Sequence, residues 1–483
     1  MNTPLRRLAT TMLAMFLILM GGATWVQFVQ AEKLNTDGRN SRTLYREFGN
    51  ARGPIIVAGD AIAQSVPVDD AFKYQRTYAA GDLYSAVTGF YSIANGSTEL
   101  EHAANDVLTG KGDQLFFSRL RDLLTGRQPE GAAVETTILP AAQEAARRGL
   151  GNQQGAVVAI EPATGKILAL VSTPGFDPNA LAVHSTKEAS AVYQQLVGAD
   201  GNPLRSNATR EVYPPGSTFK LVTAATALES GQYTAESQLP APAKLPLPQS
   251  SATIGNFGGG GCGSDPISLA DALRVSCNTA FAALGLELGD DALRDQAERF
   301  GFDDASITIP MPVSRSSFPE DPNAPQTAQS AIGQFDVRAT PLQMAMVSAA
   351  IANDGKLMRP YLVDTVRAAD MTVVSQTKPS QYSTAISPGT ARQLTDMMIG
   401  VVQHGTGTAA QIRGVTVAGK TGTAENVEGQ APHAWFTAFA PAQSPRVAVA
   451  VLVEHGGNAG NEATGGRVAA PIARAVIQAV LAS

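Results

Sequence analysis

The sequence predicts an α+β protein with one membrane helix, a smaller N-terminal domain and a larger C-terminal domain. Short apolar runs typical of strands stand at both ends of the C-terminal domain, and a long stretch rich in alanine and leucine, typical of helices, lies between them. One antiparallel sheet assembled from both ends of a domain around a helical block belongs to the α+β class. At 483 residues, the chain is also too long for one ordinary core.

The first thirty residues predict a membrane anchor. The run Leu8–Val29 carries no charge and follows Arg6 and Arg7, and about 20 apolar residues suffice to cross a bilayer. The two arginines favour an N-terminus in the cytoplasm and export of the remaining chain. A cleaved signal peptide ending at Ala23 or Ala31 is the alternative, but the apolar run is longer than such peptides usually carry.

Composition excludes some classes of partner. The chain is 44% hydrophobic and 16% charged, with a net charge of -6 and no basic cluster, whereas nucleic-acid binding needs concentrated Lys and Arg. We therefore expect no nucleic-acid partner. The histidines show no metal-ligand spacing, so we expect no metal and no organic cofactor. They are His102, His184, His404, His433 and His455, of which the last two should lie near strand ends in a structural or solvent-facing role.

A change of character near Gln153 divides the exported chain. Residues 31–150 mix short extended runs such as Pro54–Ala58 with polar stretches and hold no catalytic motif, which indicates a non-catalytic spacer or docking domain. Two apolar runs, Ala156–Ile160 and Ile167–Ser172, then flank a turn with proline and glycine and predict a β-hairpin. The predicted parts are therefore residues 1–30, 31–150 and 151–483.

The rest of the C-terminal domain reads as helices followed by strands. Phe219–Leu228 and Leu269–Leu288 predict helices, and Gly231 and Gly289 supply their stops. Three strands and a closing helix are then predicted at Gly414–Gly419, Ala434–Ala440, Val447–Glu454 and Val468–Leu481.

Ser217 and Lys220 form the first motif that carries chemistry. The serine follows a Pro-Pro-Gly turn at the start of an apolar helix, and a spacing of three places Lys220 on the same face. A serine hydroxyl needs a base to become a nucleophile, and a lysine buried among apolar side chains can lose its proton. The same spacing recurs at Ser375 and Lys378, but Pro379 and polar neighbours predict a loop without chemistry there.

Two further motifs carry polar groups suited to a peptide substrate. Ser276 and Asn278 belong to the single Ser-x-Asn of the chain, within a predicted helical block, and can relay a proton and hold amide groups. Lys420 to Thr423 follow an apolar strand and offer a cation and two hydroxyls to a substrate carboxylate, while Gly422 leaves room for substrate backbone. Alone, each motif also fits an ordinary helix, loop or strand end.

Together, the three motifs resemble the penicillin-binding proteins and serine β-lactamases, which combine Ser-x-x-Lys, Ser-x-Asn and Lys-Thr-Gly in this order. Within that superfamily the chain is similar to monofunctional class B transpeptidases, and most to the actinobacterial A type associated with cell division. The likeness covers most of the chain. Its supporting motifs are Ala159 to Pro162 with Thr164-Gly165, Gly333-Gln334, Thr340 to Gln343, and His433 to Phe436.

The resemblance implies a role for each motif residue. Ser217 is the expected nucleophile, Lys220 its base, and Ser276 the relay to the leaving group. Asn278 is expected to hold the substrate. The remaining expected groups are Lys420, Thr421 and Thr423 for the terminal carboxylate, and the backbone N–H groups of Ser217 and Thr423 for the oxyanion.

The resemblance also implies substrates, partners and a compartment. Expected ligands are peptidoglycan stem peptides ending in D-Ala-D-Ala and β-lactam antibiotics, and expected partners are divisome or glycosyltransferase proteins. A D,D-carboxypeptidase or a catalytically degenerate penicillin-binding sensor are the alternatives. A class A β-lactamase is disfavoured, because no convincing counterpart of its deacylating glutamate lies between Asn278 and Lys420.

Cys262 and Cys277 are the two cysteines of the chain. In an oxidising compartment they can form a disulfide worth about 3 kcal/mol, and the glycine run before Cys262 would let the chain turn back. Two free buried thiols are the alternative. Because Cys277 stands inside the Ser-x-Asn motif, a bridge would make the wall of the cleft depend on redox state.

Overall fold

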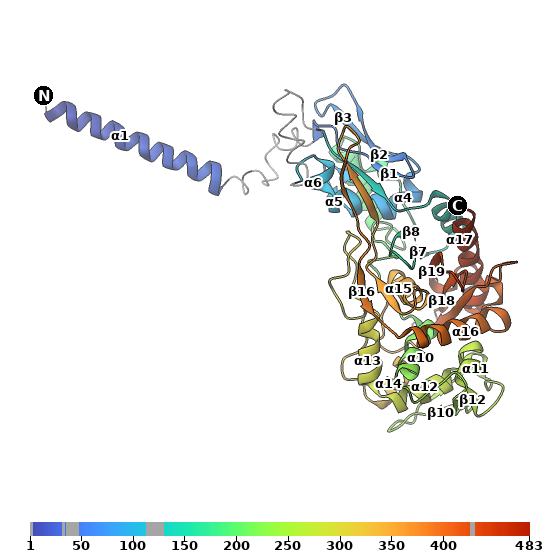
Figure 1. Ribbon diagram of the computed structural model, residues 1–483. Coiled ribbons are helices and arrows are strands. Elements are labelled where there is room, and N and C mark those ends of the chain that lie inside the picture. Colours follow the sequence, from blue (N-terminus) through green and yellow to red (C-terminus); the bar gives the residue numbers. More distant parts are fainter. Residues whose placement is uncertain (1–2, 31–33, 35–47, 113–129, 426–429) are drawn as a thin grey trace.

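The computed structural model describes residues 3–30, 34, 48–112, 130–425 and 430–483 (Figure 1). Its first helix, α1 (Thr3–Thr24), continues into the π-helical turn η1 (Trp25–Val29), and neither element buries a residue. This helix is long and apolar enough to cross a membrane. Ala31, of the alternative cleavage site, lies outside the described residues.

A five-stranded antiparallel sheet forms the centre of the C-terminal domain, in the order β17-β18-β19-β7-β8. The hairpin and the strands predicted at Ala434–Ala440 and Val447–Glu454 are confirmed, and the chain does assemble one sheet from both ends of the domain. The strands are β7 (Gly155–Ile160), β8 (Ile167–Thr173), β17 (Ala418–Ala424), β18 (His433–Ala440) and β19 (Val447–Val453).

Helices cover both faces of this sheet, so its central strand is buried throughout. On one face, α8 (Pro140–Leu150) and α17 (Ala470–Ala482) pack in the same apolar cluster as alternate residues of β19. On the other face, α15 (Pro341–Ala352) packs against the remaining residues. This alternation follows from the two-residue period of a strand.

The helical block lies beyond α15, at the end of the molecule remote from the N-terminal sheet (Figure 1). The single helix predicted at Leu269–Leu288 is wrong. It is broken into α11 (Leu269–Arg274) and α12 (Asn278–Leu288), and Ser276 between them has a φ of 61°. The break coincides with tertiary hydrogen bonds, since Lys220 donates to the Ser276 carbonyl and to the Asn278 side chain at this point. The other helices of the block are α10 (Lys220–Glu229), α13 (Asp290–Arg299), α14 (Ala324–Ser330) and α16 (Pro388–His404).

The N-terminal module is built on a six-stranded sheet in the order β15-β14-β6-β1-β2-β3. Two of its strands, β14 and β15, come from the middle of the predicted C-terminal domain, and β15 is an edge strand. Ser375 lies in β15, so the loop predicted for the second Ser-x-x-Lys is wrong at its serine, whereas Lys378 and Pro379 do lie outside any helix or strand. The strands are β1 (Ile55–Val57), β2 (Asp60–Pro67), β3 (Tyr74–Tyr78), β6 (Ala133–Thr136), β14 (Val363–Arg367) and β15 (Val373–Gln376).

Short elements complete the fold. They are the helices α4 (Gly81–Thr88), α5 (Glu99–Ala103), α6 (Asn105–Leu108) and α9 (Thr186–Val197), and the paired short strands β4 (Tyr91–Ser92) with β5 (Gly96–Ser97), β9 (Gln238–Leu239) with β12 (Ile267–Ser268), β10 (Lys244–Pro246) with β11 (Thr253–Gly255), and β13 (Lys356–Met358) with β16 (Gln381–Thr384).

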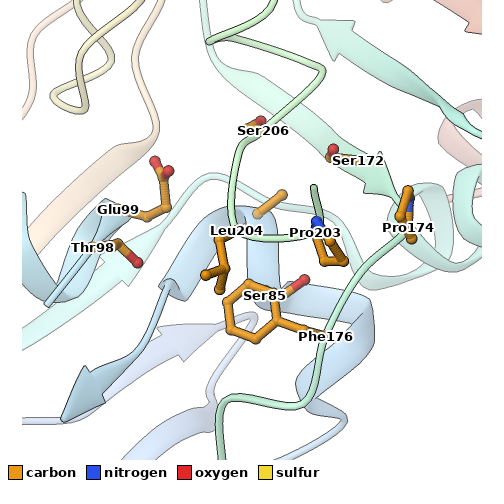
Figure 2. Close-up of a pocket in the computed structure, with 10 residues that line it drawn as sticks. Ser85, Thr98, Glu99, Ser172, Pro174, Phe176, Pro203, Leu204 and Ser206 are labelled. Carbon is orange, nitrogen blue, oxygen red and sulfur yellow. The ribbon is translucent and has the colours of Figure 1, made fainter. Parts of the chain in front are cut away.

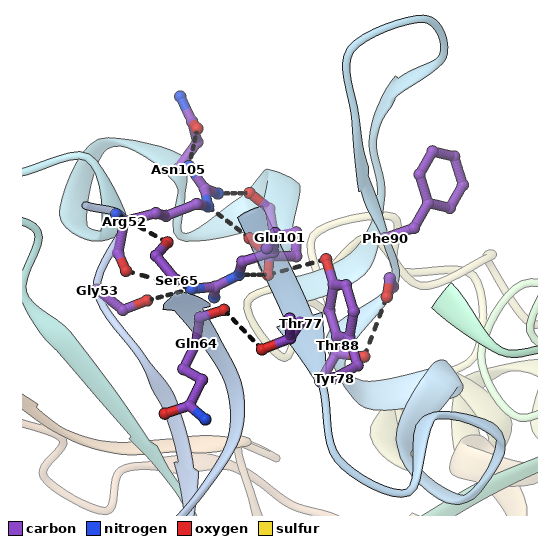
Figure 3. Close-up of polar contacts among 12 residues, drawn as sticks. Arg52, Gly53, Gln64, Ser65, Thr77, Tyr78, Thr88, Phe90, Glu101 and Asn105 are labelled. Atoms are coloured by element: carbon purple, nitrogen blue, oxygen red, sulfur yellow. Dashed lines mark hydrogen bonds and ion pairs between the residues drawn. The ribbon is translucent and has the colours of Figure 1, made fainter. Parts of the chain in front are cut away.

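A buried ion cluster holds the N-terminal module together (Figure 3). Glu101 is fully buried and accepts from Nε of Arg52 at 2.5 Å and from Nε of Arg76 at 2.6 Å. The Tyr78 hydroxyl donates to the same carboxylate at 3.2 Å. Burial alone would raise the pKa of Glu101, but the two guanidinium groups outweigh it and lower this pKa. The carboxylate therefore stays charged beside both arginines.

The two modules meet at a small pocket (Figure 2). Glu99, at the start of α5, contributes from the N-terminal module, and Leu204 and Ser206 contribute from the C-terminal domain. The Glu99 Oε2 and Ser206 Oγ atoms are buried there without a hydrogen-bond partner among the described residues. Burial raises the pKa of Glu99 to about 7, with a smaller opposing effect of Arg210.

Candidate active site

Ser217 lies on a tight turn that sits against the edge of the five-stranded sheet. The turn is a short 3-10 helix, η4 (Gly216–Thr218), and α10 starts two residues later. Gly216 has a φ of 53°, and a Cβ atom there would lie 2.8 Å from the Thr423 carbonyl oxygen, so only glycine fits. Its N–H donates to the carbonyl of Gly333 at 2.9 Å. The Gly333-Gln334 motif therefore supports the turn that carries the serine.

Lys220 is fully buried and joins the first motif to the second. Its Nζ donates to Asn278 Oδ1 at 2.7 Å and to the Ser276 carbonyl at 2.8 Å, and it lies 3.4 Å from Ser276 Oγ. The sequence predicts Lys220 beside Ser217. In the structure the hydrogen bonds of the lysine go to the Ser-x-Asn motif instead, where the kink at Ser276 places three oxygens within its reach.

Lys420, in strand β17, brings the third motif into contact with the other two. Its fully buried Nζ donates to Ser276 Oγ at 2.8 Å and to the Thr421 carbonyl at 2.8 Å. The Ser276 hydroxyl therefore lies between the amino groups of Lys220 and Lys420, and the three motifs converge on it. Residues separated by about 200 positions in the chain meet because α10, the α11–α12 junction and β17 face one another.

The electrostatics of this cluster favour neutral lysines. Burial, and next to it the charge of Lys420, lowers the pKa of Lys220 well below its ordinary value. Burial also lowers the pKa of Lys420 to about 7. In the described part of the chain, no carboxylate opposes either shift. A buried lysine without a counter-ion is suited to accept a proton from a serine.

The third motif lies within a strand rather than after one. The predicted strand Gly414–Gly419 is wrong in its bounds, since β17 covers Ala418–Ala424 and pairs with β18 across the whole motif. Hydrogen bonding along β18 extends the strand past the glycine, which sequence propensity alone does not predict. β17 is an edge strand, so no strand of the sheet pairs with its outer side, and such an edge is suited to pair with an extended peptide.

Two residues of this strand have specific contacts: Gly422 is closely packed, and Thr421 is hydrogen-bonded. A Cβ on Gly422 would lie 2.9 Å from the Trp435 side chain and 3.0 Å from the Pro215 carbonyl, so the glycine lets β17 approach the serine turn. The indole N–H of Trp435 donates to the Pro214 carbonyl at 3.0 Å. Thr421 shares a 2.6 Å hydrogen bond with Thr406, a residue that carries no sequence signal of a site.

Cys262 and Cys277 are joined by a disulfide, with Cα atoms 5.7 Å apart. The bridge ties the glycine-rich loop at Gly258–Gly263 to the middle of the Ser-x-Asn motif. Asn256, at the start of the same loop, accepts from the backbone N–H of Asn278 at 2.8 Å. Sequence reasoning missed Asn256, because a lone asparagine before glycines predicts only a turn.

The two histidines expected near strand ends do lie there. His433 begins β18 and is buried, and His455 follows β19 and is exposed. Burial, and then the neighbouring His455, lowers the pKa of His433 to about 4, so this imidazole is neutral at physiological pH. Its ring contacts Tyr213 with 5.5 Å between centroids. A structural role fits this neutral, buried ring.

Comparisons with known proteins identify both modules of the chain. Residues 155–478 match the penicillin-binding protein transpeptidase domain, and residues 52–134 match the penicillin-binding protein A dimerisation domain. The chain is 46% identical to the peptidoglycan D,D-transpeptidase PbpA of Mycolicibacterium smegmatis, over 100% of this chain and 99% of that protein. It is 45% identical to its namesake in Mycobacterium tuberculosis, with the same coverage.

Solved structures show the same likeness. Penicillin-binding protein A from M. tuberculosis, as a ceftriaxone acyl-enzyme complex, superposes with a TM-score of 0.87 at 45% identity, over 90% of this chain and 100% of that one. Its penicillin G acyl-enzyme complex gives a TM-score of 0.85 at 45% identity, over 89% and 100%.

The fold and the three converging motifs define a serine acyltransferase of the transpeptidase class. The match to the transpeptidase domain covers two thirds of the chain, and the PbpA relative matches over nearly its whole length. These two findings narrow the assignment from the class to a family. The chain belongs to the class B penicillin-binding protein transpeptidase family, in the group that carries the penicillin-binding protein A dimerisation domain.

Proposed function

We propose that this enzyme cross-links peptidoglycan stem peptides through an ester formed between Ser217 and the penultimate D-alanine of a D-Ala-D-Ala donor. The observation that carries this proposal is the position of the Ser276 hydroxyl, bonded to Lys420 and within 3.4 Å of Lys220. A buried lysine base, a bridging hydroxyl and a second cation are the groups that acyl transfer to and from a serine needs.

The reaction can be followed atom by atom. Neutral Lys220 accepts the proton of Ser217 as its Oγ attacks the donor carbonyl, and backbone N–H groups of Ser217 and Thr423 stabilise the oxyanion. Ser276 passes a proton from Lys220 to the nitrogen of the terminal D-alanine, which leaves as the amide bond breaks. An amine of a second stem peptide then attacks the ester carbonyl and gives up a proton through Ser276 to Lys220. The amide cross-link forms as the ester C–O bond breaks, and Lys220 returns the proton to Ser217 Oγ.

The other motif residues position the donor peptide. Lys420, Thr421 and Thr423 would bind its terminal carboxylate from the open edge of β17, and Asn278 would bind its amide groups. A cation with a pKa of about 7 becomes fully charged when a carboxylate approaches, because an opposite charge favours the protonated form. Binding of the substrate carboxylate would therefore raise the pKa of Lys420, and the positive charge that results would hold the carboxylate.

β-Lactams should acylate the same serine, since their strained amide takes the place of the D-Ala-D-Ala bond. The M. tuberculosis relatives are described as acyl-enzyme complexes with ceftriaxone and penicillin G. A slow-hydrolysing ester on Ser217 follows for this chain.

We place the catalytic domain outside the cytoplasm, on a single-pass anchor with Arg6 and Arg7 on the cytoplasmic side. The Cys262–Cys277 disulfide supports an oxidising compartment. The N-terminal module, proposed to cover residues 31–150, would serve as a pedestal or docking domain. Its divisome or glycosyltransferase partners, and a role in septal wall synthesis, stay predictions from the resemblance.

Intact-mass spectrometry of the full chain with penicillin G tests this proposal. We expect one drug mass, mapped to the peptide that holds Ser217, and none in Ser217→Ala. Retained labelling of the Ser217→Ala variant would contradict the proposed nucleophile. A donor peptide offered with and without an amine acceptor then separates cross-linking from the carboxypeptidase alternative, in which water takes the acyl group even when the amine is abundant. No labelling of the wild type, with intact drug, would indicate a degenerate sensor.

A further inference from the structure

The N-terminus of α12, which presents Asn278 to the active site, has no cap of its own. Its N-cap residue is Cys277, which makes no side-chain cap and has its sulfur in the disulfide. The first N–H groups of a helix lack intrahelical partners, and a side-chain oxygen at the N-cap ordinarily satisfies one of them. The Ser-x-Asn motif therefore starts a helix whose orphan donors need a partner from elsewhere.

Asn256 supplies that partner from 22 residues upstream. Its Oδ1 accepts from the backbone N–H of Asn278 at 2.8 Å and from that of Thr279 at 3.2 Å. Its Nδ2 donates to the Gly260 carbonyl at 3.1 Å and lies 3.3 Å from Thr279 Oγ1. Two backbone donors at one end fix which end of the carboxamide is oxygen. All hydrogen-bonding groups of this side chain are thus used between the loop and the helix.

The same segment also sets the orientation of the Asn278 side chain. Asn278 Nδ2 donates to the Gly255 carbonyl at 3.2 Å, directly before Asn256, while Asn278 Oδ1 accepts from Lys220 at 2.7 Å. The backbone of Asn278 is held by the Asn256 side chain and its carboxamide by the Gly255 backbone. Asn278 is therefore held at its backbone and at its side chain, and its Oδ1 atom is kept facing Lys220.

We propose that Asn256, which lies outside the three motifs, is a positioning residue for the reaction. It replaces the missing cap of α12, holds the Ser-x-Asn motif against Lys220 and so keeps this lysine in place as the base. The inference rests on the proposed roles of Ser217 and Lys220. It assigns Asn256 no contact with substrate, only the geometry of the residues that make such contacts.

The disulfide and Asn256 differ in what they constrain. Cys262 and Cys277 limit how far the loop can move from the motif, whereas a covalent bond between sulfur atoms leaves the backbone N–H groups of Asn278 and Thr279 unsatisfied. The hydrogen bonds of Asn256 therefore carry the orientation. Removal of the Asn256 side chain should therefore lower the rate of acylation even when the disulfide is intact.

Asn256→Ala in the full-length, oxidised protein tests the proposal through the rate of acylation by penicillin G, measured between about pH 6 and pH 10. We expect a fall of about 100-fold, because a displacement of about 1 Å at a catalytic group has that effect. We also expect the rising limb of the pH profile to move to higher pH, since water that reaches Lys220 raises its pKa toward the ordinary value. A wild-type rate with an unchanged profile would overturn the proposal.

Asn323→Ala is the matched control. Asn323 caps α14 by accepting from the Gln326 N–H, so the same atoms are removed from a helix end that carries no motif residue. Both variants should lose similar thermal stability, but Asn323→Ala should keep the wild-type rate and pH profile. An equal loss of rate in Asn323→Ala would show a general effect of destabilisation and would overturn the positioning role.

Asn256→Asp covers the case in which the alanine variant does not fold. Aspartate still accepts from both N–H groups, so α12 keeps its cap, while the bonds donated by the Asn256 Nδ2 atom are lost. We expect Asn256→Asp to keep most of the wild-type rate, and a fall of about 100-fold, as large as that expected for the alanine variant, would contradict the proposal. Ser217→Ala in the same assay separates the two claims: labelling there would contradict the proposed nucleophile, whereas unaltered Asn256 variants beside an unlabelled Ser217→Ala would contradict the positioning role alone.

Discussion

Two regions of this protein bury a pair of basic side chains, and they treat the charge in opposite ways. In the N-terminal module, Arg52 and Arg76 share the carboxylate of Glu101. In the active site, Lys220 and Lys420 share only the hydroxyl of Ser276 and have no carboxylate partner among the described residues. Burial is nearly complete in both places.

The difference follows from what each cation can do with its proton. A guanidinium stays charged in proteins, so burying two of them requires a counter-ion, and the lowered pKa of Glu101 shows that the carboxylate supplies it. A lysine can instead lose its proton when burial makes the charge costly. The N-terminal cluster uses burial to strengthen an ion pair, and the active site uses burial to create a base.

Lys220→Arg breaks the comparison most directly and should have the largest effect. Arginine keeps hydrogen-bond donors near Ser276 but cannot become neutral, so acylation by penicillin G should slow by about 10³- to 10⁴-fold, as when a catalytic triad member is lost. Stopped-flow or quenched mass spectrometry measures the rate. Lys166→Arg, at a partly exposed ion pair with Asp364, is the control and should leave the rate unchanged. A Lys220→Arg rate within about tenfold of the wild type would contradict a neutral base.

Glu101→Gln tests the other half of the comparison. It leaves two buried arginines without a charge partner, so the free energy of unfolding should fall by about 3–5 kcal/mol. Denaturant titration measures this loss, while the protein that remains folded should acylate normally. Glu144→Gln, which removes the exposed partner of Arg148, should cost less than about 0.5 kcal/mol. Equal losses in the two variants would mean that the buried cluster is not held by its charges.

Reduction of the disulfide sharpens the comparison, because a covalent bond, and no ion pair, helps to hold the Ser-x-Asn motif beside the two buried lysines. Opening Cys262–Cys277 should lower the free energy of unfolding by about 3 kcal/mol in the chain-entropy description. Thermal melts with and without reductant measure the change. A double Cys262→Ser and Cys277→Ser variant should be indifferent to reductant, and a wild type equally indifferent would count against a stabilising bridge.

Glu99→Gln gives the smallest predicted effect and concerns a carboxyl group with no ion-pair partner. The pKa of Glu99 in the folded protein, about 7, lies above its unfolded value, so the folded state binds more protons between these values. Stability should therefore fall as pH rises from about 5 to 7, and glutamine should remove about 1–3 kcal/mol of that fall. Melting curves at about pH 5 and pH 8 measure it, and parallel curves for the two proteins would contradict the raised pKa.

The sequence predicts the sheet and the motifs better than it predicts where the motifs lie on their elements. Apolar runs are strong signals for β7, β8, β18 and β19, because burial on both faces demands them. The break at Ser276 and the extension of β17 past Gly422 depend on tertiary contacts, the first with Lys220 and the second with β18. Neither contact is visible in a local pattern.

Contacts between distant segments explain the remaining misses. β14 and β15 join the N-terminal sheet although more than 200 residues separate them from its other strands. Composition alone does not predict that these two strands belong to the N-terminal module. Asn256 acts on a helix 22 residues away, and Thr406 meets Thr421 through the packing of α16 beside β17. The residues of the three motifs, and Gly333 and Trp435 beside the serine turn, could be named from sequence, whereas Asn256 and Thr406 could not.

The pH dependence of Ser217 acylation by penicillin G in the wild-type protein tests the central claim most directly. If the active site keeps Lys220 neutral by burial without a counter-ion, the rate should reach half its maximum at a pH far below about 10.4, the ordinary pKa of lysine. A midpoint near the ordinary lysine value would show that Lys220 is charged at rest, and would contradict the account of the base.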